Sequence, residues 1–300
     1  MSDGTRLRRL GARGLVVVLA GALVGVVAPA SPASAAVPGL MRISATSSFT
    51  SNNFQSVIAV CPVGKVLLGA GYEIIGAAGE VTVDDFRPSG SATTAPTSVY
   101  VGAYEIDELA DPWMVKAYAV CADPVAGLVR IAVTNAYDSA DVHSVVASCP
   151  TGKVLTGTGF EMQEVVGKGI VDDLRPNGTS ATAPTSVDVR AYEADPFFGP
   201  WTLTAYAICA NPLPGLVQVS ATSGTSSDDY RSSTAVCPSG KVLTGGGFEA
   251  RDAFGQVVVD DFSPNGGPAT GPTSVITGAY EEDPYSSDWS VRTFALCASM

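Results

Sequence analysis

The stretch CPVGKVLLGAGYE, from Cys61 to Glu73, decides the fold, because it returns twice more along the chain. CPTGKVLTGTGFE begins at Cys149 and CPSGKVLTGGGFE begins at Cys237, so that successive copies start 88 residues apart. A second cysteine follows the first of each copy after 59 intervening residues, at Cys121, Cys209 and Cys297. A period this long and this constant indicates that one structural unit has been triplicated.

The copies are separated by short segments rich in proline and glycine, ADPVAG at 122–127 and NPLPG at 211–215. Such segments are typical of turns between structural units. Linkers of this length hold neighbouring units in contact. The predicted organisation is a leading segment 1–35 followed by repeats at 36–124, 125–212 and 213–300.

Residues 1–35 have the pattern of a secretory signal peptide. Four arginines between positions 6 and 13 precede an apolar run from Gly14 to Ala28, and Ala33-Ser34-Ala35 supplies small residues for cleavage. The apolar run is shorter than the ~20 residues of a membrane span. The sequence therefore predicts export, cleavage before Ala36, an extracellular location and no membrane insertion after cleavage.

The exported part is strongly acidic. Removing residues 1–35 takes four arginines and one aspartate from 17 basic and 29 acidic residues, which leaves a net charge of −15. A surface with this charge repels phosphate backbones and anionic lipid head groups. Nucleic acids and membrane surfaces are therefore not expected as partners.

Apolar residues alternate with polar ones at a period of two, as in Trp113 to Cys121 and again in Trp201 to Cys209. This alternation indicates strands with one buried face, and no segment has a sustained helical period. The predicted fold is all-β. The six strands predicted for the first repeat lie at about 41–48, 55–61, 65–74, 80–86, 97–105 and 113–121.

The cysteines are best explained by one disulfide in each repeat: Cys61–Cys121, Cys149–Cys209 and Cys237–Cys297. In the chain-entropy model a loop of this length contributes ~4 kcal/mol to stability. A structural zinc site is not expected, because there is no C-x-x-C pair and only one histidine.

Two arrangements of the repeats are compatible with this pattern. The first choice is three small antiparallel sandwiches in series, and the alternative is a single β-prism-like body. The constant repeat length favours the alternative, because closure about an axis penalises changes in length. Gly69 and Gly71 recur in every copy and share one face of a strand. We interpret them as leaving room for a tryptophan ring such as that of Trp113.

Recurring acidic and aromatic residues are the candidates for a binding site. An Asp-Asp pair ends the fourth predicted strand of each repeat and a Tyr-Glu pair ends the fifth. The candidates are Asp84, Asp85, Tyr104, Glu105, Asp172, Asp173, Tyr192, Glu193, Asp260, Asp261, Tyr280 and Glu281. If the strand ends cluster, each copy offers carboxylates beside a tyrosine that can stack on a sugar ring.

Three other interpretations of the carboxylates remain open. They could cap turns by accepting hydrogen bonds from loop amides. They could supply oxygen ligands to Ca²⁺, although no calcium-loop motif is present. They could also form the carboxylate pair of a glycoside hydrolase.

The sequence argues against an enzyme. His143 is the only histidine, its counterparts are Gln55 and Arg231, and we expect it on the surface. No G-x-S-x-G segment occurs, and an enzyme rarely repeats its active centre three times. We therefore assign no catalytic residue, no cofactor and no metal ligand.

The segments C-P-x-G-K-V-L-x-G-x-G-[YF] and W-x-[VL]-x-[AT]-[YF]-A-x-C-A resemble a repeat of secreted proteins from high-GC Gram-positive bacteria. That family has no assigned activity, so the resemblance implies no site residues. The C-P-x-G segments, the Asp-Asp pairs and the late cysteines are also similar to the vitelline membrane outer layer protein. That second resemblance implies a β-prism and binding of oligosaccharides.

The leading functional prediction is a secreted, non-enzymatic, multivalent protein that binds a glycan or a cell-envelope polymer. Three equal sites would raise avidity without new chemistry. The alternatives are a structural or protective extracellular protein without a small ligand, and a secreted glycoside hydrolase. The sequence sets neither the ligand nor the oligomeric state.

Overall fold

The computed structural model describes residues 37–194 and 197–300, so the predicted signal segment lies outside the described residues. The described chain is all-β, as predicted. The first repeat forms β1 (Met41–Thr46), β2 (Phe54–Val60), β3 (Val66–Ile75), β4 (Val81–Pro88), β5 (Ser98–Glu105) and β6 (Met114–Ala122). The second forms β7 (Val129–Thr134), β8 (Val142–Ser148), β9 (Val154–Gln163), β10 (Gly169–Pro176), β11 (Ser186–Glu193) and β12 (Thr202–Ala210). The third forms β13 (Val217–Thr222), β14 (Tyr230–Val236), β15 (Lys241–Arg251), β16 (Val257–Pro264), β17 (Ser274–Glu281) and β18 (Ser290–Ser299).

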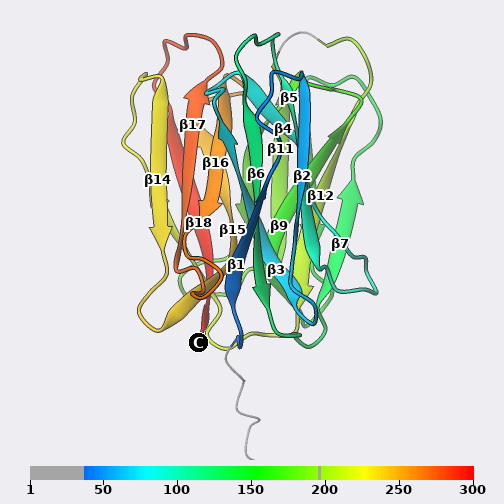
Figure 1. The fold of residues 1–300 in the computed structure, drawn as a ribbon, viewed down its shortest axis with the longest axis vertical. Helices are drawn as coiled ribbons and strands as arrows, with labels where there is room; N and C mark the ends of the chain where they lie inside the picture. The colour runs from blue at the N-terminus through cyan, green and yellow to red at the C-terminus, as the bar shows by residue number, and fades with distance from the viewer. Residues whose placement is uncertain (1–36, 195–196) are drawn as a thin grey trace, which may run out of the picture. The chain divides into compact units, whose positions relative to one another are not determined.

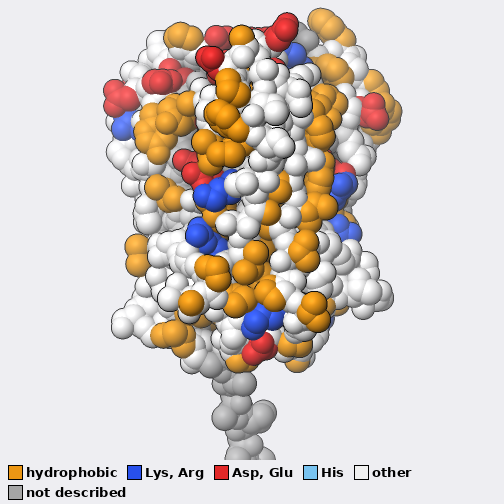
Figure 2. All heavy atoms as spheres, in the orientation of Figure 1, with side chains coloured by type: hydrophobic (Ala, Val, Ile, Leu, Met, Phe, Trp, Pro, Cys, Tyr) orange, Lys and Arg blue, Asp and Glu red, His pale blue; other side chains and the backbone are white. Residues whose placement is uncertain are grey.

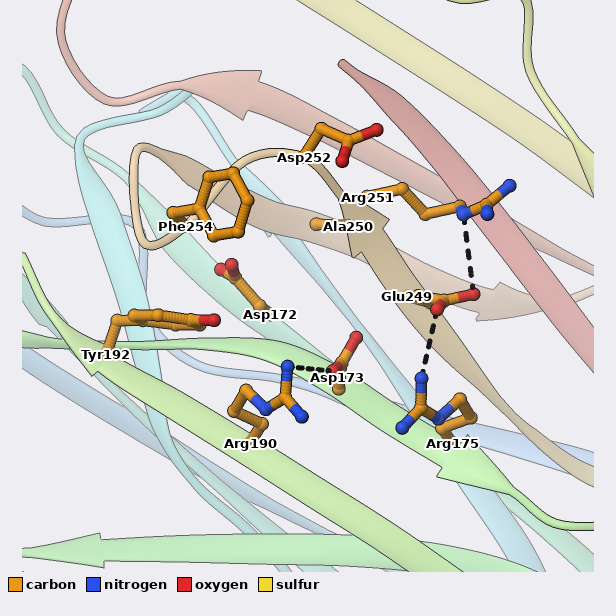
Figure 3. Close-up of a pocket in the computed structure, with 10 residues that line it drawn as sticks. All are labelled: Asp172, Asp173, Arg175, Arg190, Tyr192, Glu249, Ala250, Arg251, Asp252 and Phe254. Carbon is orange, nitrogen blue, oxygen red and sulfur yellow. Dashed lines mark hydrogen bonds and ion pairs between the residues drawn. The ribbon is translucent and has the colours of Figure 1, made fainter. Parts of the chain in front are cut away.

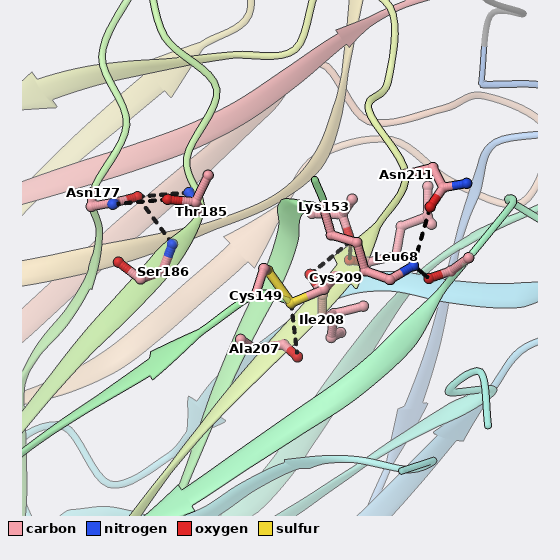
Figure 4. The surroundings of a disulfide bond; sticks show 12 residues. Leu68, Cys149, Lys153, Asn177, Thr185, Ser186, Ala207, Ile208, Cys209 and Asn211 are labelled. Atoms are coloured by element: carbon pink, nitrogen blue, oxygen red, sulfur yellow. Dashed lines mark hydrogen bonds between the residues drawn. A yellow bond between two sulfur atoms is a disulfide. The ribbon is translucent and has the colours of Figure 1, made fainter. Parts of the chain in front are cut away.

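The predicted cysteine pairing is confirmed in all three repeats, Cys61–Cys121, Cys149–Cys209 and Cys237–Cys297. Figure 4 shows the second disulfide beside the loop in which Asn177 accepts backbone hydrogen bonds from Thr185 and Ser186. Each bond ties the end of the repeat's second strand to its sixth strand. Because these strands belong to different sheets, the disulfide holds the two halves of a repeat together.

The strands of each repeat are divided equally between two sheets (Figure 1). All sheets are antiparallel and six-stranded, and every one contains three strands from each of two repeats. Their orders are β1-β6-β3-β16-β17-β14, β2-β5-β4-β9-β12-β7 and β13-β18-β15-β10-β11-β8.

The expected arrangement of separate sandwiches in series is therefore wrong, and the alternative, a single β-prism-like body, is observed. Each repeat does supply two facing three-stranded halves, but neither half ends at its own repeat. In the second repeat β9 pairs with β4 of the first, and β10 pairs with β15 of the third. The pairing of β16 with β3 closes the cycle. The two inner strands of an isolated repeat would otherwise be unpaired edges, which this closure removes.

Glycines let β3, β9 and β15, one strand from each repeat, approach one another closely at the pseudo-threefold axis. A Cβ on Gly157 would lie 2.6 Å from the Cα of Gly69, and one on Gly69 would lie 2.6 Å from the Cα of Gly245. A Cβ on Gly245 would in turn lie 2.8 Å from the Cα of Gly157. The interpretation that these glycines make room for a tryptophan is thus wrong, because the neighbouring atoms are backbone atoms of another repeat.

Large side chains form a closed layer next to the glycines. Tyr72 lies against Phe86 with ring centroids 5.3 Å apart, and Phe248 lies 5.5 Å from Phe262. The six residues of the layer are at most 1% exposed: Tyr72, Phe86, Phe160, Leu174, Phe248 and Phe262. Since every repeat contributes two of them, the hydrophobic effect at the centre stabilises the three repeats jointly.

One outer edge strand of each sheet, β1, β7 or β13, is also hydrogen-bonded to a loop of a neighbouring repeat. The backbone N–H of Arg130 in β7 donates to the carbonyl oxygen of Ser91, in the loop between β4 and β5. Gln218 in β13 donates in the same way to Thr179, and Arg42 in β1 donates to Gly267. Each repeat is therefore bonded to the preceding one at the rim as well as at the axis.

Exposed acidic residues are concentrated in loops. In the view of Figure 2, acidic side chains gather toward the upper end of the body. The loop between β5 and β6, for example, carries the exposed Asp107, Glu108 and Asp111. Among the residues that the structure describes, no helix has the length and apolar character needed to span a membrane.

Candidate functional site

The Asp-Asp pairs lie where a sheet passes from one repeat to the next. We name these places the 1–2 junction (β4 with β9), the 2–3 junction (β10 with β15) and the 3–1 junction (β16 with β3). At the 2–3 junction Asp173 is the register partner of Glu249. Each candidate site is therefore shared by two repeats and is not contained in one copy.

A β-bulge redirects the first aspartate of each pair. The register between β10 and β11 shifts between Val171 and Asp173, which leaves Asp172 as the extra residue. The same shift precedes Asp85 and Asp261. A bulged residue leaves the ladder and turns away from it. This turns Asp172 toward the next repeat, while Asp173 keeps its place opposite Glu249.

The first aspartates are buried and hydrogen-bonded across the junctions. Asp84, Asp172 and Asp260 are 3%, 3% and 2% exposed. Oδ2 of each accepts from a backbone N–H of the following repeat, at 3.4 Å from Gly167, 3.0 Å from Gly255 and 3.1 Å from Gly79. Oδ1 of all three is buried without a hydrogen-bond partner. These bonds agree with the interpretation that the aspartates accept hydrogen bonds from loop amides.

Burial raises the pKa of Asp84, Asp172 and Asp260 well above the usual value, and the adjacent aspartate adds to this. Hydrogen bonding from a glycine N–H acts in the opposite direction and is the smaller effect, and at Asp172 the N–H of Phe254 and the charge of Arg190 also lower the pKa. Transfer of a charge out of water is more costly than one such bond can offset. These carboxyl groups are therefore neutral over a range of pH in which an exposed aspartate is charged.

We predict that Asp172→Asn makes stability less dependent on pH. A raised folded-state pKa stabilises the fold below the unfolded pKa of about 3.9, and this contribution is lost as pH rises through the folded value. Asparagine resembles the neutral acid and does not titrate. The melting temperature of the variant relative to wild type should therefore increase from pH 4 to pH 8.

One titrating proton changes the free energy of unfolding by at most ~1.4 kcal/mol per pH unit. The exposed Asp111→Asn is the control, and thermal melts at several pH values are the measurement. If the melting temperatures of Asp172→Asn and wild type differ by the same amount at every pH from 4 to 8, then Asp172 is charged in the folded protein.

The second aspartates lie closer to solvent. Burial raises the pKa of Asp85, Asp173 and Asp261 to about 6 in each case, and the glutamate facing each of them adds to the effect. Nearby cations act against this shift, Arg87 at Asp85 and Lys116 at Asp261. These side chains can therefore both donate and accept hydrogen bonds at mildly acidic pH.

The glutamate of each Tyr-Glu pair is committed to the core. Glu105 Oε1 accepts from Trp113 Nε1 at 2.7 Å, and its Oε2 accepts from the backbone N–H of Leu109 at 3.1 Å. Glu193 bonds to Trp201 and Glu281 to Trp289 in the same manner. The structure thus places Glu105, Glu193 and Glu281 on the fully buried tryptophans and the following loops, while the adjacent tyrosines lie beside the aspartates.

The tyrosines are half-buried at the rims of the junctions. Tyr104 packs on Phe54 with ring centroids 4.4 Å apart, and Tyr280 packs on Tyr230 at 4.5 Å. Tyr192 has no such neighbour on β8, where valine occupies the equivalent position. It lies instead edge-on to Phe254, 6.4 Å away, on the loop after β15.

A pocket of about 210 Å³ opens at the 2–3 junction (Figure 3). Asp172, Asp173 and Tyr192 of the second repeat form one side of it. The third repeat supplies Glu249 and Phe254 on the other side. Arginines complete the lining: Arg175, Arg190 and Arg251. The pocket therefore combines aromatic rings with groups of both charges.

Departures from the repeat pattern make this junction different from the others. Arg190 stands where the other repeats have glycine, Arg251 where they have glutamine and isoleucine, and Phe254 where they have valine and alanine. These three residues do not recur in the other copies, so a search for recurring residues does not find them. The informative signal was a change of residue type in one copy only.

A second pocket of about 350 Å³ lies on the other side of Arg175. In the first two repeats an arginine, Arg42 or Arg130, covers the aromatic ring that faces it. The third repeat has Gln218 at this position, and its side chain accepts instead from the backbone N–H of Gly178 at 2.9 Å. The space left beside Phe294 forms part of this pocket.

His143 is not on the surface, contrary to expectation. It is 5% exposed, and its ring lies 4.0 Å from that of Trp201. It is also bonded to the Asn135 side chain. Within residues 37–194 and 197–300, no group of three or more histidine, cysteine or acidic side chains is placed to hold a metal ion.

No family model and no curated protein matches this chain. Among solved structures, similarity was found to a chain described as "The Triple Jelly Roll Fold and Turret Assembly in an Archaeal Virus". The identity is 9%, the alignment covers 86% of this chain and 91% of that chain, and the TM-score is 0.18. A score this low supports no argument about fold or function.

Proposed function

We propose that this chain is a secreted, non-enzymatic protein that binds a glycan or a cell-envelope polymer at the junctions between its repeats. Three disulfides fit an oxidising, extracellular environment. The signal pattern of residues 1–35 would direct the chain there.

The observation that carries the proposal is the pocket at the 2–3 junction. Tyr192 and Phe254 stand there beside carboxyl and guanidinium groups. A sugar ring has apolar faces and a polar edge, and it therefore suits a site that offers aromatic surface together with hydrogen-bonding groups. The other junctions retain the aromatic rim and the aspartates, so a polymer that reached two junctions would gain avidity.

Binding is favoured over hydrolysis by the position of the inner aspartates. A glycoside hydrolase needs an acid that reaches the glycosidic oxygen and a second carboxylate beside the sugar ring. Asp172 could serve as an acid by its raised pKa, but its Oδ1 is buried. Asp84 and Asp260 are buried in the same way.

We expect Tyr192→Ala to weaken glycan binding about tenfold, because a ring that stacks on sugar contributes ~1.4 kcal/mol. A glycan array with wild type identifies the bound class, and titration of the variant measures the loss. Tyr137→Ala is the matched control, because Tyr137 is 60% exposed and lies outside the pocket.

The same experiment separates the alternatives. Absence of binding to every glycan and envelope polymer tested would support a structural or protective protein. Release of shorter sugars during incubation would support the hydrolase.

A further inference from the structure

Four of the 13 basic residues in the exported chain gather at the 2–3 junction. Three of them line the first pocket, and Arg292 joins Arg175 at the second. The equivalent residues are Arg87, Gly102, Gln163 and Thr204 at the 1–2 junction, and Ser263, Gly278, Ile75 and Lys116 at the 3–1 junction. In a chain with a net charge of −15, this concentration of cations is local to one junction.

The arginines differ in how far they are already bonded. Arg175 is already bonded to two carboxylates, because it donates to Glu249 at 3.1 Å and to Asp188 at 2.8 Å. Arg190 interacts with the Tyr192 hydroxyl, but it and Arg251 reach the nearest carboxylates, those of Asp173 and Glu249, only at 3.8 Å. Their side chains are 38% and 49% exposed. Their guanidinium groups therefore keep donors for a ligand (Figure 3).

Two buried acceptors at the 2–3 junction have no hydrogen-bond partner. In the first two repeats a tyrosine hydroxyl, of Tyr118 or Tyr206, donates to the glutamate that corresponds to Glu249. Phe294 stands at this position in the third repeat, and Glu249 Oε2 is left without a hydrogen bond. Oδ1 of the 3%-exposed Asp172 is a second such atom. Both atoms are buried, so a ligand in the pocket does not contact them directly, but the missing tyrosine hydroxyl sets Glu249 apart from its counterparts.

We propose that the pocket at the 2–3 junction binds an acidic saccharide whose carboxylate pairs with Arg190 and Arg251. This inference rests on the proposed function and deepens it by naming the ligand class. The fork of a guanidinium group matches the two oxygens of a carboxylate. The ring of the sugar lies against Tyr192 and Phe254, and its hydroxyls meet exposed polar groups of the carboxyl and guanidinium side chains that line the pocket.

A uronate, which is a sugar with one carboxylate group, fits the site better than a phosphate polymer does. The pocket contains carboxyl groups as well as arginines, and the surrounding surface is acidic, so a ligand with a dense negative charge is repelled. One carboxylate per sugar supplies a charge for the arginines and leaves hydroxyls for the carboxyl groups. The aromatic rings have no counterpart in a phosphate chain.

The test compares oligosaccharides that differ only in the carboxylate. Oligomers of glucuronic, galacturonic and mannuronic acid are titrated calorimetrically against the exported protein, beside neutral oligomers of glucose, galactose and mannose with the same linkage and length. Arg251→Gln and Arg190→Gly place the residues of Gln163 and Gly102 at the 2–3 junction. Arg42→Gln is the control, because it also replaces an arginine with glutamine but lies outside the pocket at the 2–3 junction.

We expect at least one acidic oligomer to bind tenfold or more tightly than its neutral partner. Arg251→Gln should remove most of this preference, while Arg42→Gln should keep it. Equal binding of acidic and neutral oligomers, weakened by Tyr192→Ala, would overturn this inference and leave the proposed function standing. A preference that survives both Arg251→Gln and Arg190→Gly would also overturn it. Failure of all oligomers to bind would overturn both.

Discussion

Replacing Gly157 with alanine is expected to lower the free energy of unfolding by about 3 kcal/mol or more. The new Cβ would lie 2.6 Å from the Cα of Gly69 and closer still to the carbonyl oxygen of Leu68. Both atoms belong to the backbone of β3, in which Gly69 pairs with Val120 of β6 and Leu68 is the bulged residue next to it. They cannot move away without breaking that pairing, and so the clash cannot be relieved by rotation of a side chain.

Chemical denaturation of the variant measures this effect, and Gly267→Ala is the control. A Cβ on Gly267 would meet nothing within 4 Å, and its φ is not positive. The control should change stability by less than ~0.5 kcal/mol. Because the contacts are cyclic, alanine at Gly69 or Gly245 should be as damaging as alanine at Gly157. A loss at Gly157 no larger than that at Gly267 would contradict the close approach of the strands at the axis.

The strands and the disulfides could be predicted from the sequence because their signals are local or strictly periodic. Alternation from Trp113 to Cys121 defines β6 and its buried face, and the constant cysteine spacing defines the pairing. Both features depend only on residues inside one repeat.

The sharing of sheets between repeats could not be predicted in the same way. A strand that pairs within its own repeat has the same alternation as one that pairs with a neighbour, so β9 gives no sign that it joins β4. Gly157 and Gly159 did carry information about close packing. Their partners were wrongly inferred because a glycine shows only that space is needed, and not which atoms occupy it.

The candidate site was predicted in part. The Asp-Asp pairs and tyrosines do lie at the junctions, but Glu105 and its copies bond to buried tryptophans. The bulge that separates the roles of Asp172 and Asp173 has no clear sequence signal. Arg190 and Arg251 were missed because recurrence in all copies reveals what the fold needs, whereas a function specific to one junction appears as a departure from the pattern.

The interdependence of the repeats is tested most directly by isolating one of them. Residues 125–212, with the Cys149–Cys209 disulfide formed, contain every strand from β7 to β12. They lack the partners of β9 and β10 and the neighbours that bury Phe160 and Leu174, which are 1% and 0% exposed in the full chain. Without these neighbours the isolated repeat buries less apolar area. The remaining burial is too small to offset the conformational entropy that is lost when a unit of this size folds.

The measurement is the amide spectrum of the isolated repeat by two-dimensional NMR, compared with that of residues 36–300. The full chain should give widely dispersed amide signals, and residues 125–212 should give the narrow dispersion of an unfolded chain. Narrow dispersion would mean that the junctions, and with them the binding sites, exist only in the closed body. A well-dispersed spectrum with a cooperative thermal transition for residues 125–212 would show that each repeat folds as an independent sandwich, contradicting the interdependence of the three repeats.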